Sequence, residues 1–544
     1  MSISNRFSAI FIGIAIAAFR HAAMAYPGQA EAGFNPNASN VVRVTPVQPD
    51  GKVFVGGRFD MLSGVEINRL ARLNADGTLD SGFNSNADGQ VICMTVLPDG
   101  KTIVGGEFMT VTGVTRRGIA RIHANGSLDT SFNLNVDGTV TFAAVQNDQK
   151  ILIGGYFFHA GGAERRSLAR INANGTLDPG FDPDPDGNVG CAAVQPDGKI
   201  IIGGSFNAVG GYTRNYIARL NANGTVDTGF NPNANLDVSS VVIQPDGKIL
   251  IVGQFTTVGG IARNYVARLN ANGTVDMGYD PKLNRLPGVV FSGAYALALQ
   301  TDGAAIIGGH FATAAGPVRN YLLRIKPDGT PDEDFNPNAN YDIYGLALQA
   351  DGKVLASGDF TAVGGAARNY VARLKNGPAT QSLTATTSSR VQWLRGGTSP
   401  EVGQVSFELS TDGGAVWTSL GAGTRITDGW ELAGLNLPAS GQIHARGLTG
   451  GSSSSLMETR ASFTVSLEEP FRILSAVLSG GNLLITFPTV TGLKYTLWQS
   501  DSMADGWSDA GLPFNVGDDT NQVFTVAAPV TGIPKRFYRV QALP

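Results

Sequence analysis

The stretch that decides the fold is Leu-Asn-Ala-Asn-Gly-Thr-Val-Asp-Thr-Gly-Phe-Asn-Pro, residues 220–232, followed at residues 244–248 by Gln-Pro-Asp-Gly-Lys. Both patterns recur seven times. The Asp of the second pattern stands, in steps of 49 residues apart from one step of 56, at Asp50, Asp99, Asp148, Asp197, Asp246, Asp302 and Asp351. The aromatic residue of the first pattern stands at Phe34, Phe83, Phe132, Phe181, Phe230, Tyr279 and Phe335. A fixed period of this length is typical of solenoids, propellers and arrays.

Each repeat reads as four antiparallel strands. In the fourth copy, residues 188–195 and 199–206 are β-prone on either side of a Pro-Asp-Gly turn, which predicts a hairpin. Residues 216–221 and 225–230 predict two more strands, joined by a two-residue turn at Asn223-Gly224. Four strands in about 40 to 50 residues is the geometry of a propeller blade. The sequence therefore predicts an all-β fold with a seven-bladed β-propeller.

The seventh copy stops early, and its missing end occurs at the N-terminus. The aromatic residue expected one period after Phe335 is absent near Thr384. Residues 33–38, however, repeat residues 229–234 letter for letter. We therefore expect the N-terminal strand to complete the last blade and close the ring, which leaves few exposed sheet edges. The longer sixth period predicts a protruding loop around residues 284–290.

These motifs resemble the delta-60 repeat family of bacterial exported proteins. The resemblance rests on residues 220–232 and on the Gln-Pro-Asp-Gly-Lys pattern, and it covers about residues 30 to 377. It implies a β-propeller in an extracytoplasmic setting. It implies no activity, and no catalytic residues are carried over.

The N-terminus reads as an export signal. Arg6 supplies the positive charge, residues 7–19 are apolar, and Ala23-Met24-Ala25 fits a cleavage site after Ala25. We expect a secreted or cell-surface protein with no membrane span after signal removal, because no later apolar run is long enough. The net charge of −4 gives no reason to expect a nucleic-acid partner, and we expect a monomer.

The chain divides into four parts: a signal peptide (1–25), the propeller (26–377), and two small β-sandwich-like domains. The first of these, residues 378–467, alternates in short strands and resembles an immunoglobulin-like sandwich. The second, residues 471–544, reads as a small all-β module. Cys93 and Cys191 hold equivalent positions two repeats apart, too distant to bridge, so we expect two small core residues.

Positions that vary inside the constant frame are candidates for a binding site. One such position lies between Gly and the core Phe of Gly-Gly-x-Phe, and strand alternation places it opposite the buried Phe. Its residues are polar in every copy and different in each: Arg58, Glu107, Tyr156, Ser205, Gln254, His310 and Asp359. They predict a ring of ligand-binding groups at one mouth of the central channel; the alternative is seven unconstrained solvent positions.

Two sets of arginines recur with the repeat. The first, Arg72, Arg121, Arg170, Arg219, Arg268, Arg324 and Arg373, pairs in sequence with the Asp of Gly-Thr-x-Asp and predicts a repeated ion pair. The second predicts either a solvated rim or an anion-attracting ring, and comprises Arg116, Arg165, Arg214, Arg263, Arg319 and Arg368.

A calcium site is a further hypothesis. Asp182, Asp184 and Asp186 precede Gly187 as in the first half of a calcium loop, although the twelfth position is Ala193 where an EF-hand has Glu. The alternative is side-chain capping of a turn. Residues 410–417 fit an Asp-box, which predicts a hairpin turn and is no evidence for glycoside hydrolysis.

No catalytic motif stands out, so a binding function comes first. The five histidines show no metal-ligand spacing, and no nucleophile elbow or phosphate loop occurs. We expect a binding or adhesion scaffold with a carbohydrate or protein ligand. The alternatives are a carbohydrate-active lyase or hydrolase that uses polar residues at the propeller mouth, and a structural surface-layer component.

Overall fold

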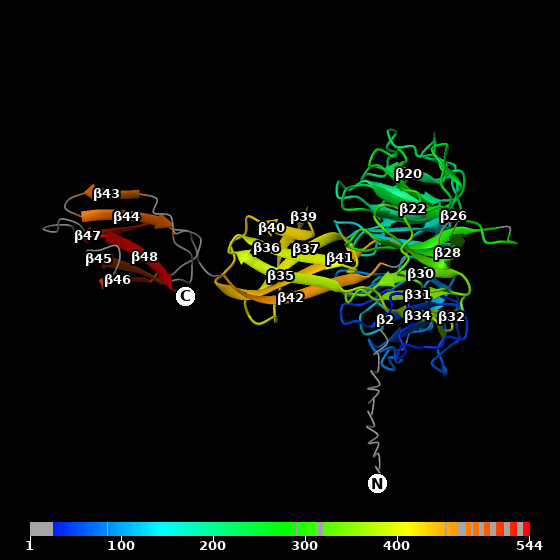
Figure 1. The fold of residues 1–544 in the computed structure, drawn as a ribbon, viewed down its shortest axis with the longest axis horizontal. Helices are drawn as coiled ribbons and strands as arrows, with labels where there is room; N and C mark the ends of the chain where they lie inside the picture. The colour runs from blue at the N-terminus through cyan, green and yellow to red at the C-terminus, as the bar shows by residue number, and fades with distance from the viewer. Residues whose placement is uncertain are drawn as a thin grey trace, which may run out of the picture.

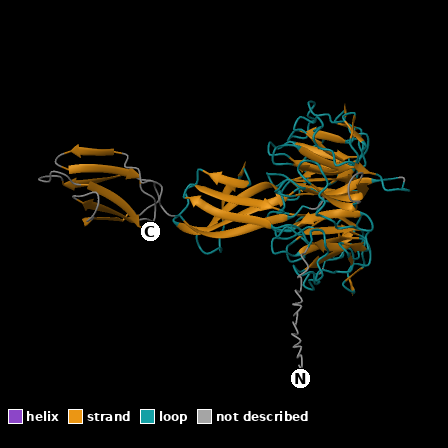
Figure 2. Cartoon of the chain, viewed as in Figure 1, coloured by secondary structure: helices purple, strands orange, loops and turns teal. Residues whose placement is uncertain are grey.

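The computed structural model describes residues 26–83, 85–289, 291–313, 319–451 and 454–465, and the backbone of six strands between residues 475 and 543. Its regular elements are β-strands (Figure 1, Figure 2). The part of the chain that is described holds no helix of the length and hydropathy needed to cross a bilayer. The expected export signal, residues 1–25, lies outside these ranges.

Residues 42–374 form seven antiparallel sheets, one for each repeat, in which the middle strand pairs with an inner and an outer strand. The inner strands are β1 (Val42–Val44), β6 (Val91–Val96), β11 (Thr139–Val145), β16 (Val189–Val194), β21 (Val238–Ile243), β27 (Gly293–Leu299) and β30 (Ile343–Leu348). The middle strands are β2 (Val53–Gly57), β7 (Thr102–Gly106), β12 (Ile151–Tyr156), β17 (Ile200–Gly204), β22 (Ile249–Gly253), β28 (Ala305–Thr313) and β31 (Val354–Gly358). The outer strands are β5 (Leu70–Leu73), β10 (Ile119–Ile122), β15 (Leu168–Ile171), β20 (Ile217–Leu220), β25 (Val266–Leu269), β29 (Asn320–Ile325) and β34 (Val371–Leu374).

Six repeats carry a small hairpin of two two-residue strands between the middle and outer strands. These hairpins are β3 (Met61–Leu62) with β4 (Val65–Glu66), β8 (Thr110–Val111) with β9 (Val114–Thr115), β13 (His159–Ala160) with β14 (Ala163–Glu164), β18 (Ala208–Val209) with β19 (Tyr212–Thr213), β23 (Thr257–Val258) with β24 (Ile261–Ala262), and β32 (Ala362–Val363) with β33 (Ala366–Ala367).

The fourth strand of each blade is shorter than predicted. In the fourth copy it is a single bridge between Leu220 and Val226 rather than a strand over residues 225–230. The cause is Asp227, whose Oδ2 accepts from Arg219 at 2.8 Å while its Oδ1 accepts from the amide of Gly229 at 3.0 Å. This Asx turn ends the pairing and directs Phe230 into the space between sheets.

The last sheet pairs with the N-terminal segment. Ala30 bridges Leu374, the amide of Glu31 donates to the Arg373 carbonyl at 2.8 Å, and the amide of Lys375 donates to the Gln29 carbonyl at 2.8 Å. The register is the one that Leu79 keeps with Leu73 in the first copy. Each inner strand contacts the inner strand of the next repeat, and β1 contacts both β6 and β30.

The predicted Arg–Asp ion pair is present in the repeats and also links neighbouring blades. Arg219 Nε lies 2.8 Å from Asp227 Oδ2, and its Nη1 donates to the Ala271 carbonyl of the next repeat at 2.6 Å. In the seventh copy Arg373 pairs with Glu31, which stands where the other copies have Asp, and donates to the Ala75 carbonyl of the first copy at 2.5 Å. A charge-assisted bond of this kind fixes the angle between blades as well as their contact.

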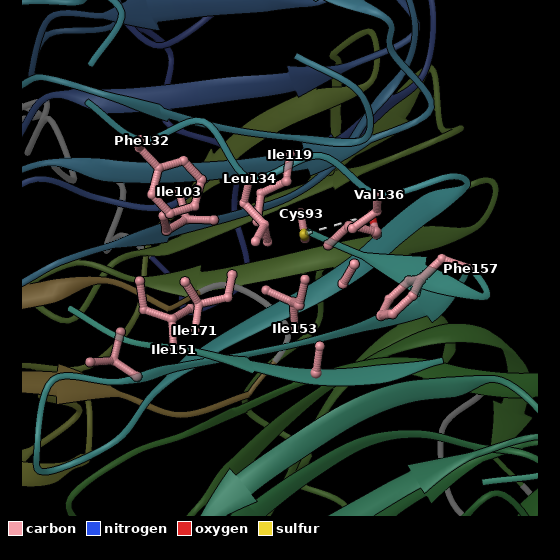
Figure 3. Close-up of a cluster of buried hydrophobic side chains, with 14 of the residues drawn as sticks. Cys93, Ile103, Ile119, Phe132, Leu134, Val136, Ile151, Ile153, Phe157 and Ile171 are labelled. Carbon is pink, nitrogen blue, oxygen red and sulfur yellow. Dashed lines mark hydrogen bonds between the residues drawn. The ribbon is translucent and has the colours of Figure 1, made fainter. Parts of the chain in front are cut away.

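Apolar side chains fill the space between adjacent sheets. Figure 3 shows one such cluster, in which Cys93 and Ile103 of the second copy meet Ile151 and Ile153 of the third beneath Phe132. Both cysteines are free and buried, as predicted, and burial raises the pKa of each thiol to about 12. They are therefore packing groups rather than nucleophiles.

The sixth copy differs from the others at one face of the propeller. Strand β28 extends to nine residues, and its end pairs with an additional strand, β26 (Leu283–Asn284). Beside the β26 and β28 labels a green loop projects on the right of Figure 1, close to where the sequence predicts a protruding loop.

Residues 379–464 form two four-stranded sheets around a shared core that includes Trp393 and Phe407. One sheet contains β35 (Ala379–Thr387), β36 (Arg390–Gly397), β40 (Gly429–Ala433) and β39 (Thr424–Ile426), and the other β38 (Thr418–Ala422), β37 (Val402–Ser410), β41 (Ser440–Thr449) and β42 (Leu456–Thr464). We call this part the second unit. Further along the chain, two three-stranded sheets contain β43 (Ser475–Ser479), β44 (Asn482–Pro488) and β47 (Val523–Pro529), and β46 (Ser508–Asn515), β45 (Lys494–Ser500) and β48 (Phe537–Leu543).

Candidate functional site

Every inner strand of the propeller carries a β-bulge at the same place. The register shifts lie between residues 42/44, 91/93, 140/142, 189/191, 238/240, 294/296 and 343/345. A bulge inserts one residue that has no partner in the ladder and re-aims its side chain. The seven inserted residues all line one cavity: Arg43, Ile92, Thr141, Gly190, Ser239, Tyr295 and Tyr344.

The second Gly of Gly-Gly-x-Phe makes the bulge possible. In the fourth copy a Cβ on Gly204 would lie 2.1 Å from the carbonyl oxygen of Asn188, which is the residue that enters the inner strand. The same carbonyl accepts from the amide of Ser205 at 2.9 Å. A side chain at Gly204 would therefore push the two backbones apart exactly where the bulge begins, which explains why glycine stands there in each repeat.

The cavity has a volume of about 540 Å³ and is blocked at one end by the second unit. Glu401, Gln404 and Gly451 belong to its lining, and a Cβ on Gly451 would meet the Leu297 carbonyl oxygen at 2.1 Å. The docking is held by backbone bonds, including that from the Glu401 amide to the Leu299 carbonyl at 2.8 Å. At the other end the lining reaches the propeller face that carries the Gly-Gly-x-Phe positions.

The bulge residues that line the cavity differ in size. The third, fourth and fifth copies contribute Thr141, Gly190 and Ser239, which leave space. The sixth, seventh and first copies contribute Tyr295, Tyr344 and Arg43, which fill the opposite side. The two tyrosine rings stack with their centroids 5.8 Å apart, and the Arg43 guanidinium lies 4.1 Å from the centre of the Tyr344 ring. Such packing of a cation on an aromatic face holds all three side chains in place.

Burial shifts the ionisable groups of the site toward their neutral forms. It lowers the pKa of Arg43, raises the pKa of Tyr295 to about 12, and raises the pKa of the Asp237 carboxyl. Arg43 Nε is buried and has no hydrogen-bond partner.

Three of the seven predicted ring residues line the cavity: Tyr156, Ser205 and Gln254. Tyr156 is 62% exposed and stands at the rim. The other four, Arg58, Glu107, His310 and Asp359, stay outside the lining. Strand alternation places these four residues on the predicted face of the propeller, but it does not bring them into the cavity. The bulge residues of the inner strands line the cavity instead.

Two of those four residues pair with the next repeat. Arg58 Nε donates to Gln90 Oε1 at 2.5 Å, and His310 Nδ1 lies 2.5 Å from Asp342 Oδ1. The His310 side chain is 14% exposed and packs edge-on against the stacked rings of Tyr321 and Tyr341. Burial, and then the charge of Asp342, raise the pKa of Asp359. His310 is thus held as part of an acidic and aromatic cluster beside the cavity.

The structure does not bring the predicted calcium ligands together. Asp182 faces Arg165 at 3.3 Å, Asp184 faces Arg166 at 3.7 Å, and Asp186 Oδ1 accepts from the amides that follow Phe206. Within the described ranges, no group of three or more His, Cys, Asp or Glu side chains is placed to hold a metal. These carboxylates do not fit Ca²⁺, because each has a cation or an amide as its partner; Asp186 acts as the turn cap that was the alternative reading.

The second arginine set is neither a solvated rim nor an anion-attracting ring. All six members are buried. Arg214 is typical: it donates to the carbonyls of Thr213 at 2.8 Å and Thr228 at 3.1 Å. The Arg214 guanidinium therefore ties the end of its blade to the small hairpin of the same repeat, and its charge is not offered to solvent. Arg368 makes the same bonds to Glu31 and Ala32 of the N-terminal segment.

The Asp-box forms the expected turn. Asp412 Oδ1 accepts from the amides of Ala415 and Val416 at 3.0 Å each, and Gly413 has φ of 78°. The turn lies in the second unit, away from the cavity lining. It contributes to the fold of that unit.

Comparison with known proteins agrees with the repeat architecture. Seven stretches match a family model described as a domain of unknown function (DUF5122) beta-propeller, at residues 48–83, 97–132, 146–181, 195–230, 244–279, 300–335 and 349–377. Each of the seven repeats is thus similar to a DUF5122 β-propeller repeat. The bulge of each repeat lies just before the matched stretch. No curated protein matches the chain.

Two solved structures show a distant similarity to the chain. A streptogramin B lyase shares 14% identity with a TM-score of 0.40, over 63% of this chain and 96% of the lyase. The extracellular domain of a protein described as a one component system in B. thetaiotaomicron shares 9% identity with a TM-score of 0.16, over 78% of this chain and 74% of that domain. At these TM-scores neither protein informs the ligand or activity of this chain.

Proposed function

We propose that this chain is an exported binding protein that holds a carbohydrate in the cavity of its propeller that the bulge residues line. The observation that carries the proposal is the cavity itself: it is blocked behind by the second unit, is lined by the seven bulge residues, and has the size typical of a small-molecule site. Its lining includes the hydroxyl and amide groups of Tyr156, Asn188, Ser205 and Gln254, and such groups recognise sugar hydroxyls.

The architecture that we infer is a seven-bladed ring closed by the N-terminal segment, followed by an immunoglobulin-like sandwich and a small β module. The pairing of Ala30 with Leu374 and the bond from Arg373 to Ala75 support closure. The two four-stranded sheets around Trp393 support the sandwich. The finer naming as delta-60 repeats rests on the sequence pattern at residues 220–232. We further propose cleavage after Ala25, a location outside the cytoplasm, and a monomer.

A glycan array probed with residues 26–544, with and without Ca²⁺, tests the binding proposal. Ser239→Trp places a large side chain on the open side of the cavity and should abolish the signal. Ser81→Trp, at an exposed turn, is the matched control and should leave it unchanged. Absence of binding to every glycan, or equal binding by Ser239→Trp, would contradict the proposal.

A second candidate function is a carbohydrate-active lyase or hydrolase. The observation that favours it is the pair of His310 and Asp342 with Asp359 close by, since a carboxylate-oriented imidazole is a usual general base. His310 Nε2 is buried without a hydrogen-bond partner. Release of reducing ends or unsaturated products from a bound polysaccharide, lost in His310→Gln while binding persists, would establish this function. Binding of a polysaccharide without any turnover would exclude the enzyme and leave the binding scaffold as the function.

A further inference from the structure

Arg43 differs from the other repeat-associated arginines in having no polar partner. Arg72 pairs with Asp80, and Arg214 donates to two carbonyls. For Arg43, the described residues provide the face of the Tyr344 ring at 4.1 Å and no hydrogen bond or ion pair. The carboxylates of Asp359 and Glu107 act on Arg43 only through space, without a direct bond. Leaving a half-buried charge without a bonded partner costs free energy, because the protein replaces water poorly around it.

The fold holds this cation in the cavity wall. The bulge between Val42 and Val44 points Arg43 into the cavity, and Tyr344, itself fixed by Tyr295, lies against it. The position is therefore built by two blades rather than reached by a flexible surface side chain. An Arg that is oriented in advance loses less entropy when it binds an anion.

The rest of the lining offers few other charges. Asp237 enters from the fifth copy, and burial raises the pKa of its carboxyl. Glu401 lies at the blocked end and is paired with Arg425. Between Arg43 and Asp237 the small bulge residues leave room, and neutral polar groups surround it: Asn188, Ser205, Ser239 and Gln254. The cavity thus has a cation at one end and hydroxyl and amide groups along the rest of its wall. Such a site suits a polar ring that carries one acidic group.

We propose that the cavity binds an acidic sugar, with its carboxylate on Arg43 and its hydroxyls on Asp237 and the neutral polar groups. The proposal rests on the proposed carbohydrate-binding function and specifies its ligand class. A guanidinium binds a carboxylate through two parallel hydrogen bonds, which gives orientation as well as affinity. A sulfate ester offers the same charge with a different geometry, and the experiment separates the two.

The test is titration calorimetry of the chain from residue 26 onward with short oligogalacturonates and oligoglucuronates. Neutral galactose and glucose oligomers and their sulfated forms are the comparison ligands. We expect the uronates to bind about 10- to 100-fold more tightly than the neutral oligomers, as loss of a charged hydrogen-bond pair predicts. Preference for sulfated over uronate ligands would overturn the carboxylate assignment.

Variants of Arg43 test whether this residue produces the selectivity for acidic sugars. Arg43→Gln should lose the selectivity for acidic sugars, and Arg43→Lys should keep the charge but bind more weakly, since ammonium lacks the planar fork. Arg58→Gln is the matched control, because Arg58 lies on the same face but donates to Gln90 outside the cavity lining. Circular dichroism and the melting temperature establish that each variant is folded.

The outcomes separate the two levels of the proposal. If uronates and neutral oligomers bind equally, or if a folded Arg43→Gln keeps the selectivity, the acidic-sugar inference is wrong and the carbohydrate site stands. If no sugar binds, the proposed function itself is wrong. Should Arg43→Gln fail to fold, the ligand comparison on the unaltered chain and on Arg43→Lys still decides.

Discussion

Replacing Phe34 by Ala tests whether the N-terminal segment belongs to the last blade. Phe34 has no exposed surface, lies beneath the Arg373 guanidinium at 4.4 Å, and packs against Gly77 of the first copy. Phe230 has the same environment inside the ring, fully buried with Arg219 at 4.5 Å. Truncating a buried Phe to Ala costs about 3–5 kcal/mol. If the N-terminal segment completes the seventh blade, Phe34→Ala should cost as much as Phe230→Ala.

Thermal unfolding of residues 26–544, followed by far-UV circular dichroism, measures this cost. For a propeller of roughly 350 residues the entropy of unfolding is about 0.7 kcal/mol/K, so a loss of about 4 kcal/mol lowers the transition by about 5 °C. All five tryptophans lie beyond the propeller, so their fluorescence reports on the C-terminal units and should change little. A propeller transition that Phe34→Ala leaves within about 1 °C, while Phe230→Ala lowers it by about 5 °C, would refute the closure.

Three further outcomes are expected. Hydrogen bonds from Lys199 first, and then from Arg219, lower the pKa of Asp227 from 3.8 to about 2. The stability that this carboxylate contributes is therefore complete above pH 3.8 and is lost as the pH falls through 2, so the melting temperature of Asp227→Asn should depend less on pH in this window than that of the unaltered chain. An unchanged pH dependence would show that the ion pair is not formed. Arg214→Ala should destabilise the propeller by about 2–3 kcal/mol in urea unfolding, because it removes two hydrogen bonds to carbonyls. Arg166 is 50% exposed, so the control Arg166→Ala should change stability by less than about 0.5 kcal/mol. Equal effects would contradict the structural role given to the buried Arg214. Gly204→Ala should lower the yield of folded protein sharply, because the new Cβ would lie 2.1 Å from a carbonyl oxygen. Gly211→Ala should lower the yield less, because its Cβ would meet no atom within 4 Å, although Gly211 has a positive φ of 78°. The reverse order of yields would show that Gly204 is not required for the β-bulge.

The repeat made the architecture predictable, because burial and turn chemistry act in the same way in every copy. The period located the aromatic residues between blades and the Arg–Asp pairs. The turn at Asn223-Gly224 was predicted less well: Gly224 has φ of 94°, but Asn223 does not have positive φ, and its side chain instead accepts from the Thr225 amide. Local side-chain bonding replaced the expected two-residue turn.

The cavity lining was only partly predictable, for a physical reason. Simple alternation assigns every second residue of a strand to one face. The bulge adds a residue and reverses that assignment, so Arg43 and Tyr344 were missed although they vary between copies as much as Tyr156 and Gln254 do. The Gly directly before each variable residue was the available signal, because a glycine that meets a carbonyl indicates an irregular inner strand.

The pairing of Glu31 with Arg373 has a consequence for how the protein is made. The two residues are 342 positions apart, so one partner leaves the ribosome long before the other. Until Arg373 arrives, Phe34 lacks the cation that covers it, and the seventh sheet stays unfinished. Contacts between distant parts of a chain form slowly and leave apolar groups open to aggregation in the meantime. A protein with this topology gains from remaining unfolded until synthesis is complete, and translocation of an extended chain followed by folding on the far side would meet that need.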